Sequence, residues 1–416
     1  MGSNKQSNIN HYLVVATGIA LCMGPSALAF SCAGIFYTPV STALGVGKGT
    51  FAVYMTVLCF TMFFALSFAG KILAAKDARA VLSTAVLLVG GGLFAMGFFN
   101  AVWQFYIAGA FIGFGESILL YLAVPTLINR WFKQRVGFFV GLCMAFTGVG
   151  GVLFNPLGDY LITTHGWQMG YRVFGILAIA IALPFTLFAI RSFPKDKGLL
   201  PYGDNGQDHL TAAPVVMGVS ASKAFKSGPF FATAAFAGLV GFNSVIYQFL
   251  PSYASSLPLA ATVVGLAGLL ASAAMAGQAL GKVGLGTIAD KSIMGGMWTA
   301  LICGAAGLVL LWFVPTSVAI VLIAGFLFGP FYACAVVQVP LMARSIFGVR
   351  EYSQIYSRIS MFSALMAAFG ATIWGYLIDW TGFRILFILG LIVLACTALV
   401  GVYALGAGKK LEQTAE

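Results

Sequence analysis

Three ionisable side chains lie within segments that are otherwise almost entirely apolar, and they are the strongest candidates for chemistry in this sequence. Lys282 lies in the run AGQALGKVGLGTIADK, about eight residues, or about 12 Å at helical rise, before Asp290. Arg358 lies at a similar depth in another apolar segment, and Glu116 lies about 20 Å from Trp103 along a third. A lysine at the centre of a membrane helix costs about 2.5 to 3.5 kcal/mol, so each of these residues requires a partner or a function.

The two cations suggest a binding site for an anion. Lys282 and Arg358 are each about eight residues inside a predicted helix, and two cations at one level of an apolar region repel each other unless an anion lies between them. Two other interpretations remain open. Lys282 could extend its long side chain to the cytoplasmic interface, and Arg358 could form a structural salt bridge or bond to helix carbonyls.

Glu116 is the candidate for proton coupling, because a carboxylate near mid-bilayer carries its charge only at high cost unless a cation neutralises it. It could also pair with Arg358 or Lys282, or remain neutral in a hydrogen bond between helices. Other polar side chains are expected to line a substrate cavity: Asn243, Tyr247, Gln278 and Tyr121.

The composition identifies a membrane protein rather than a soluble one. Of the 416 residues, 60% are hydrophobic and only 8% are charged, too few to cover a soluble surface. The net charge of +11 comes from short clusters between apolar segments, so no nucleic-acid partner is expected. The sequence has no Cys/His metal pattern, no GK[ST] loop and no pair of nucleophile and base within the membrane. We therefore expect no metal, no cofactor and no enzymatic activity.

The fold is predicted to be all-α, with twelve transmembrane helices and both termini in the cytoplasm. Each crossing needs about 20 apolar residues, and the loops after even-numbered crossings carry nearly all of the Lys and Arg residues. The predicted crossings are residues 12–38, 51–74, 80–98, 103–128, 137–162, 169–191, 229–251, 261–285, 297–314, 317–342, 353–378 and 384–406.

The chain divides into two predicted halves of six helices each. Residues 1–191 and 228–416 form the two bundles, and the polar residues 192–227 form a cytoplasmic linker. Residues 70–76 recur in outline as residues 286–291, which indicates a duplication. Parallel repeats of this kind predict a substrate site at mid-bilayer between the halves.

The loop sequence Gly286-Thr287-Ile288-Ala289-Asp290-Lys291 resembles the Gly-x-x-x-Asp-Arg/Lys motif of the major facilitator superfamily, and the resemblance covers almost the whole chain. It implies that Gly286 and Asp290 take part in a conformational switch. The first half departs from the motif, because Ala74 stands where the aspartate is expected.

Further details resemble the monocarboxylate transporter and oxalate/formate antiporter branch, including Asn-Arg-Trp-Phe at residues 129–132. That branch commonly has an arginine at the position of Lys282, where it holds the substrate carboxylate, and lysine keeps the charge without the bidentate geometry. Gln278 replaces the aspartate of mammalian members, so their aspartate-based proton coupling does not carry over. Arg358 falls one residue before the second cation of oxalate/formate antiporters.

These observations predict a monomeric secondary transporter of the plasma membrane, of bacterial inner-membrane type, in contact with lipid. Its substrate would be a small organic anion, a mono- or dicarboxylate, moved by alternating access in symport with protons or in antiport with another anion. Two alternatives are a proton-driven exporter of amphipathic or cationic compounds, in which Glu116 binds the cation, and a membrane sensor without net transport.

Overall fold

The computed structural model describes residues 2–75, 77–203, 217–313, 315–348, 350–411 and 414–415, and these are nearly all helical. Among them are twelve helices long and apolar enough to cross a membrane, which confirms the predicted fold class. The side of the membrane on which the termini lie stays a prediction. The twelve spans are Ile9–Leu44, Lys48–Leu66, Ala78–Met96, Val102–Trp131, Phe138–His165, Trp167–Ala189, Gly228–Ser256, Leu266–Lys291, Ile293–Phe313, Val318–Phe347, Gln354–Thr381 and Phe383–Gly408.

The chain forms two compact units. Unit 1 contains Met1–Leu44 and Val57–Ala212, and unit 2 contains Gly45–Thr56 and Ala213–Glu416. The helix α3 (Lys48–Ala75) is therefore divided, since its first turns pack within unit 2 and the rest packs within unit 1. Within the predicted linker, residues 204–216 lie outside the described residues.

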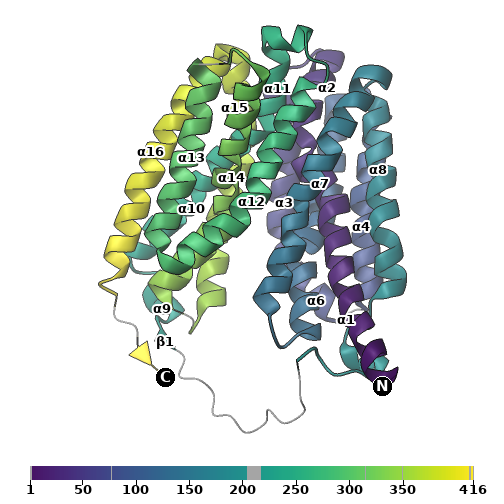
Figure 1. Ribbon diagram of the computed structural model, residues 1–416, viewed down its shortest axis with the longest axis vertical. Coiled ribbons are helices and arrows are strands. Elements are labelled where there is room, and N and C mark those ends of the chain that lie inside the picture. Colours follow the sequence, from purple (N-terminus) through teal and green to yellow (C-terminus); the bar gives the residue numbers. More distant parts are fainter. Residues whose placement is uncertain are drawn as a thin grey trace. The chain divides into compact units, whose positions relative to one another are not determined.

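Unit 1 is built from α-helices interrupted by three π-helical segments and two 3₁₀ turns. Figure 1 shows several of its long α-helices running roughly parallel to one another. Beyond the first two crossings, the spans of this unit are formed by α4, by α5 with η3 and α6, by α7, and by α8 with η4. Besides most of α3, the elements are α1 (Gly2–Leu21), η1 (Cys22–Ser31), η2 (Ala33–Phe36), α2 (Tyr37–Leu44), α4 (Ala78–Met96), α5 (Val102–Glu116), η3 (Ser117–Ala123), α6 (Val124–Trp131), α7 (Val136–His165), α8 (Trp167–Pro184), η4 (Phe185–Ala189) and η5 (Pro194–Lys197).

Unit 2 contains the remaining crossings, and its tightest pairs are α12 with α14, α13 with α14, and α10 with α15. The two short strands pair antiparallel. The elements are β1 (Met217–Gly218), α9 (Ala221–Ala224), α10 (Gly228–Ser244), η6 (Val245–Phe249), α11 (Leu250–Ser256), η7 (Pro258–Ala261), α12 (Leu266–Lys291), α13 (Ile293–Phe313), α14 (Val318–Phe347), α15 (Tyr352–Thr381), α16 (Phe383–Gly408) and β2 (Thr414–Ala415).

Two crossings differ from their predicted course for local reasons. The first was expected to be one helix over residues 12–38, but its middle is the π-helix η1, where Pro25 lacks the N–H that an α-helical ladder requires. The eighth was expected to start at residue 261. It begins at Leu266 instead, after the 3₁₀ turn η7 and after Gly265, whose φ of +81° is incompatible with a continuing right-handed helix.

The closest helix packing in unit 2 depends on two glycine pairs spaced by four residues. Gly277 on α12 faces Gly329 on α14, Gly325 of α14 lies against Leu270 of α12, and a Cβ added at Gly281 would lie 2.7 Å from the Cα of Pro330. A Cβ at Gly277 would overlap the carbonyl oxygen of Phe326. Small residues at such a crossing let two backbones touch in lipid, where no hydrophobic force drives helices together.

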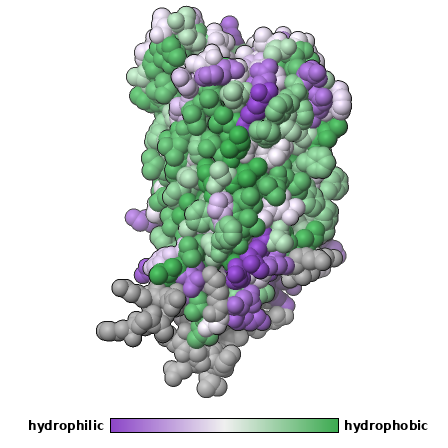
Figure 2. Space-filling model, turned by 90° about the vertical axis from the view of Figure 1, so that its right-hand side faces the viewer, coloured by the Kyte–Doolittle hydropathy of each residue, from purple (hydrophilic) through white to green (hydrophobic). Residues whose placement is uncertain are grey.

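The surface is consistent with a lipid environment. Figure 2 shows a face that is mainly hydrophobic, with hydrophilic residues gathered towards its two ends. Large apolar side chains on the crossings of unit 1 are exposed, among them Phe138, Leu153, Ile176 and Phe188. Such a surface would be unfavourable in water and is expected where lipid covers the helices.

The glycine crossing predicts a strong effect of one substitution. Gly277→Leu should lower the free energy of unfolding by more than about 3 kcal/mol, because its side chain would meet the backbone of α14 rather than a movable side chain. Gly284→Leu is the matched control, since a Cβ there meets no described atom within 4 Å. Thermal unfolding of both variants in detergent, followed by size-exclusion chromatography, checks this. Equal melting temperatures would contradict the packing account.

Candidate functional site

Glu116, the last residue of α5, is completely buried in unit 1. The Ser26 hydroxyl donates a hydrogen bond of 2.8 Å to Oε2 of its carboxyl group. Oε1 is also buried and has no hydrogen-bond partner among the described residues. A buried carboxyl group with a single neutral donor carries a charge only at high cost, so Glu116 stays a candidate for proton coupling.

Both residues of this pair lie at π-helical segments, since Ser26 is inside η1 and Glu116 directly precedes η3. A second polar contact holds the end of η1: Asn155 of α7 donates from Nδ2 to the carbonyl of Ser31 at 3.1 Å. The hydroxyl of Ser31 in turn donates to the carbonyl of Thr147 at 3.2 Å. π-helical turns are rare and often occur at functional sites, so the surroundings of Glu116 are distinctive in backbone as well as in charge.

In unit 2, α12 carries Gln278 and Lys282 one helical turn apart on the same face. Gln278 is 6% exposed, and its Oε1 has no hydrogen-bond partner among the described residues. Lys282 is half-buried and directly follows Gly281, whose contact with Pro330 fixes this part of α12 against α14. The glycine crossing thus sets the position of both side chains.

The predicted polar residues of α10 and η6 are buried in different contacts. Asn243 donates from Nδ2 to the carbonyl of Gly390 on α16 at 3.1 Å, which is a contact between helices. Tyr247 is 1% exposed and stacks on Tyr332 of α14, with ring centroids 4.6 Å apart and an interplanar angle of 21°. These two side chains therefore serve packing within unit 2, whatever else they bind.

Two other predicted ligands are exposed. Arg358 projects from α15, a helix that packs mainly on α10, whereas Lys282 is on α12, which packs mainly on α14. The two cations thus belong to different helix pairs, and their joint contact with one anion stays a prediction. Tyr121, in η3 of unit 1, is 45% exposed.

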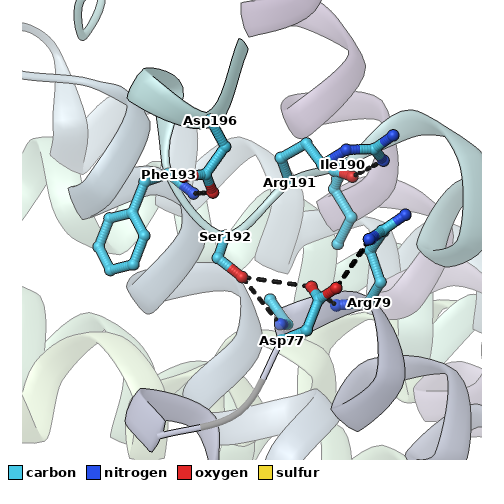
Figure 3. Close-up of polar contacts among 8 residues, drawn as sticks. Asp77, Arg79, Ile190, Arg191, Ser192, Phe193 and Asp196 are labelled. Carbon is cyan, nitrogen blue, oxygen red and sulfur yellow. Dashed lines mark hydrogen bonds and ion pairs between the residues drawn. The ribbon is translucent and has the colours of Figure 1, made fainter.

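The loop motif differs between the halves. Asp290 is exposed in the last turn of α12, and Gly286 is partly exposed one turn earlier. In the first half, Asp77 supplies a carboxylate three residues after Ala74. Figure 3 shows this carboxylate accepting from the Arg79 backbone at 3.0 Å, from the Arg79 side chain at 2.8 Å and from Ser192 at 3.3 Å. The hydrogen bonds from Arg79 hold the pKa of Asp77 below its ordinary value, so the pair persists at neutral pH.

A second carboxylate, Asp379 near the end of α15, holds the first turn of α3. Its two oxygens accept from the backbone N–H groups of Lys48 at 3.0 Å and Gly49 at 2.8 Å. Further along the same contact, the Thr56 hydroxyl lies 2.7 Å from that of Thr372. A carboxylate at a helix N-terminus satisfies free N–H groups and interacts favourably with the helix dipole.

Comparison with known proteins shows the family to which the chain belongs. The sequence model of the Major Facilitator Superfamily matches residues 19–267, more than half of the chain. Over 240 residues the chain is 25% identical to the MFS-type transporter pytF of Aspergillus terreus, covering 56% of this chain and 73% of that protein.

Two shorter matches have more specific names. The chain is 27% identical to the membrane sensor protein UhpC of Salmonella typhimurium over 36% of its own length and 33% of that protein. It is 31% identical to human monocarboxylate transporter 11 over 24% of each chain. The chain thus spans a third or less of the length of these two relatives.

The structure is similar to that of the nucleoside transporter NupG, with a TM-score of 0.68, 14% identity and coverage of 97% of this chain and 100% of NupG. At this identity the similarity is one of fold.

Sequence reasoning missed four residues that define these sites: Ser26, Asn155, Asp77 and Tyr332. Ser26 and Asn155 are small polar residues beside Pro25 and Pro156 in apolar segments, and that combination was the available signal. Asp77 lies three residues after Ala74, outside the Gly-x-x-x-Asp spacing of the motif. For Tyr332 no sequence signal existed, because its stacking partner is far away in the chain.

The Glu116 site predicts an unusual order of stability. Glu116→Gln should melt at or above the temperature of the parent protein, because an amide offers Ser26 the same acceptor without the possibility of a buried charge. Ser26→Ala should be less stable by about 1 kcal/mol, since it leaves both carboxyl oxygens without a donor. Thermal unfolding at neutral pH tests both. A large loss of stability in Glu116→Gln would indicate a charged, paired carboxylate instead.

The Asp379 contact predicts a local change. Asp379→Ala should raise the hydrogen-exchange rate of residues 45–56 by about five- to tenfold, because two N–H groups of α3 lose their acceptor, a loss of about 1 kcal/mol. Exchange measured by mass spectrometry checks this, with Asp196→Ala as the control, since Asp196 accepts from Phe193 in a separate turn of unit 1. Unchanged exchange in residues 45–56 would show that Asp379 does not hold the helix.

Proposed function

Because the chain belongs to the major facilitator superfamily, we propose that this multi-pass membrane protein is a secondary transporter of a small organic anion, a mono- or dicarboxylate, working by alternating access. Transport itself follows from the family, and the substrate class is our inference. The observation that carries it is Lys282, a cation within an apolar helix one turn from a buried amide that has an unpartnered oxygen.

A carboxylate would meet complementary groups on this face of α12. The ammonium group of Lys282 supplies a charge-assisted donor. Oε1 and Nε2 of Gln278 exchange places when the amide rotates by 180°, so the unpartnered position can present either an acceptor or an N–H donor. Lysine binds as a point charge rather than as a planar fork, so the site would accept carboxylates of varied shape. Arg358 would complete the site for a dicarboxylate, with Asn243, Tyr247 and Tyr121 in supporting positions.

Glu116 would couple transport to the proton gradient. Its carboxyl group is fully buried, has one neutral donor in Ser26 and adjoins two π-helical segments. A proton would bind when a change of conformation admits water to the group, and burial would then keep it neutral during transport. The positive charge that binds the substrate, at Lys282, would thus lie in unit 2, and the proton that couples transport to the gradient, at Glu116, would lie in unit 1.

Gly286 and Asp290 would form the conformational switch. Both lie on α12, the helix that carries Lys282, so that binding of an anion and movement of the loop act on one rigid element. Release and recapture of α3 by Asp379 would be a second changing contact.

The similarity to UhpC favours one alternative, a membrane sensor that binds its ligand without net transport. A transporter and a sensor would bind the ligand in the same way, and only a measurement of ligand movement across a membrane distinguishes the two functions. We place the protein in the plasma membrane as a monomer.

The anion site predicts the following result. Small carboxylates should raise the melting temperature of the purified protein, and Lys282→Ala should abolish the shift, because the variant lacks the charge that holds the anion. Lys223→Ala, which removes an exposed lysine on α9, is the control and should respond as the parent does. Stabilisation by lipophilic cations alone, independent of Lys282, would overturn the carboxylate assignment and favour an exporter with its site at Glu116.

A further inference from the structure

A cavity of about 560 Å³ lies at the end of unit 2 where three helix ends meet: the start of α13, the end of α14 and the end of α16. Its polar lining includes the hydroxyl-bearing Ser292 and Ser345 and the cation Lys409. Its apolar lining includes Ile293, Met294 and Leu405. None of these residues takes part in the proposed substrate site.

The charges around the cavity are mainly positive. Lys291, Arg344 and Lys410 each adjoin a lining residue in the sequence, as does the acid Glu412, and Asp290 is two residues from Ser292. At the start of α13, Ser292 accepts a hydrogen bond from the backbone of Gly295 at 3.0 Å, and the first N–H groups of that helix add partial positive charge. The last carbonyl groups of α14 and α16 add partial negative charge, and the basic residues at these helix ends offset that charge.

A lining that combines a cation, hydroxyl groups and an apolar wall is suited to bind an amphipathic anion. A free inorganic anion would gain nothing from Ile293, Met294 and Leu405, whereas acyl chains would cover them. A cavity of this size accepts a whole headgroup rather than a single ion. Basic pockets between transmembrane helices near the membrane surface are suited to anionic headgroups.

We propose that this cavity binds an anionic phospholipid, with the phosphate at Lys409, Ser292 and Ser345 and the acyl chains along the apolar wall. The bound lipid joins the ends of α13, α14 and α16. It thereby stabilises unit 2 on the side that supports α14, the helix against which α12 packs.

Purified full-length protein in uncharged detergent tests this with three additives: phosphatidylglycerol, phosphatidylcholine with the same acyl chains, and inorganic phosphate. Phosphatidylglycerol should raise the melting temperature, the other two should not, and native mass spectrometry should retain one phosphatidylglycerol molecule. Lys409→Glu should weaken the apparent affinity at least tenfold. Ser345→Trp, which fills the cavity from an exposed position, should do the same without removing a charge.

Lys223→Glu is the matched control, because it makes the same charge change outside the cavity and should keep the affinity of the parent. Three results would overturn the proposal. Equal stabilisation by phosphatidylcholine would show that charge is irrelevant, and equal stabilisation by inorganic phosphate would indicate a simple anion site. Unchanged lipid affinity in both Lys409→Glu and Ser345→Trp would show that the lipid binds elsewhere.

Discussion

An ionisable side chain within an apolar helix must be neutralised, paired or given access to water, and this constraint governs both candidate sites. In unit 1, Glu116 is buried with Ser26 as the one donor that the described residues supply, an arrangement suited to a neutral carboxyl group. In unit 2 the same constraint applies to Lys282, the residue that we propose binds the substrate anion. A transporter can use this cost, because a group that is unfavourable when alone changes its energy strongly when a proton or a substrate binds.

Backbone packing places these groups. Gly277 and Gly281 bring α12 so close to α14 that α12 has little room to slide or rotate. The backbone positions of Gln278 and Lys282 are thereby fixed. In unit 1, hydrogen bonds hold η1 at its middle, where Ser26 donates to Glu116, and at its end, where Asn155 donates to Ser31. Small residues thus fix the site in one unit, and polar side chains fix it in the other.

The sequence was sufficient for the fold class, because twelve long apolar segments admit few arrangements other than a helical membrane bundle. It also indicated Glu116, Lys282 and Gln278, whose charge or polarity contrasts with their neighbours. It did not reveal the partners. The contact of Ser26 with Glu116 spans 90 residues and the stacking of Tyr247 on Tyr332 spans 85, and such contacts depend on helix packing rather than on local pattern. The contact of Asn243 with Gly390 spans 147 residues and was not evident from the sequence for the same reason.

The most direct test of this account is uptake of a stabilising carboxylate into proteoliposomes under an imposed pH gradient, for the parent protein and for Glu116→Gln. The account predicts that the parent accumulates the carboxylate when the gradient is present. Glu116→Gln, which keeps the hydrogen bond to Ser26 but cannot release a proton, should exchange the carboxylate without accumulating it. Accumulation by Glu116→Gln equal to that of the parent would contradict the role of Glu116, and absence of any carboxylate uptake by the parent would contradict the proposed function.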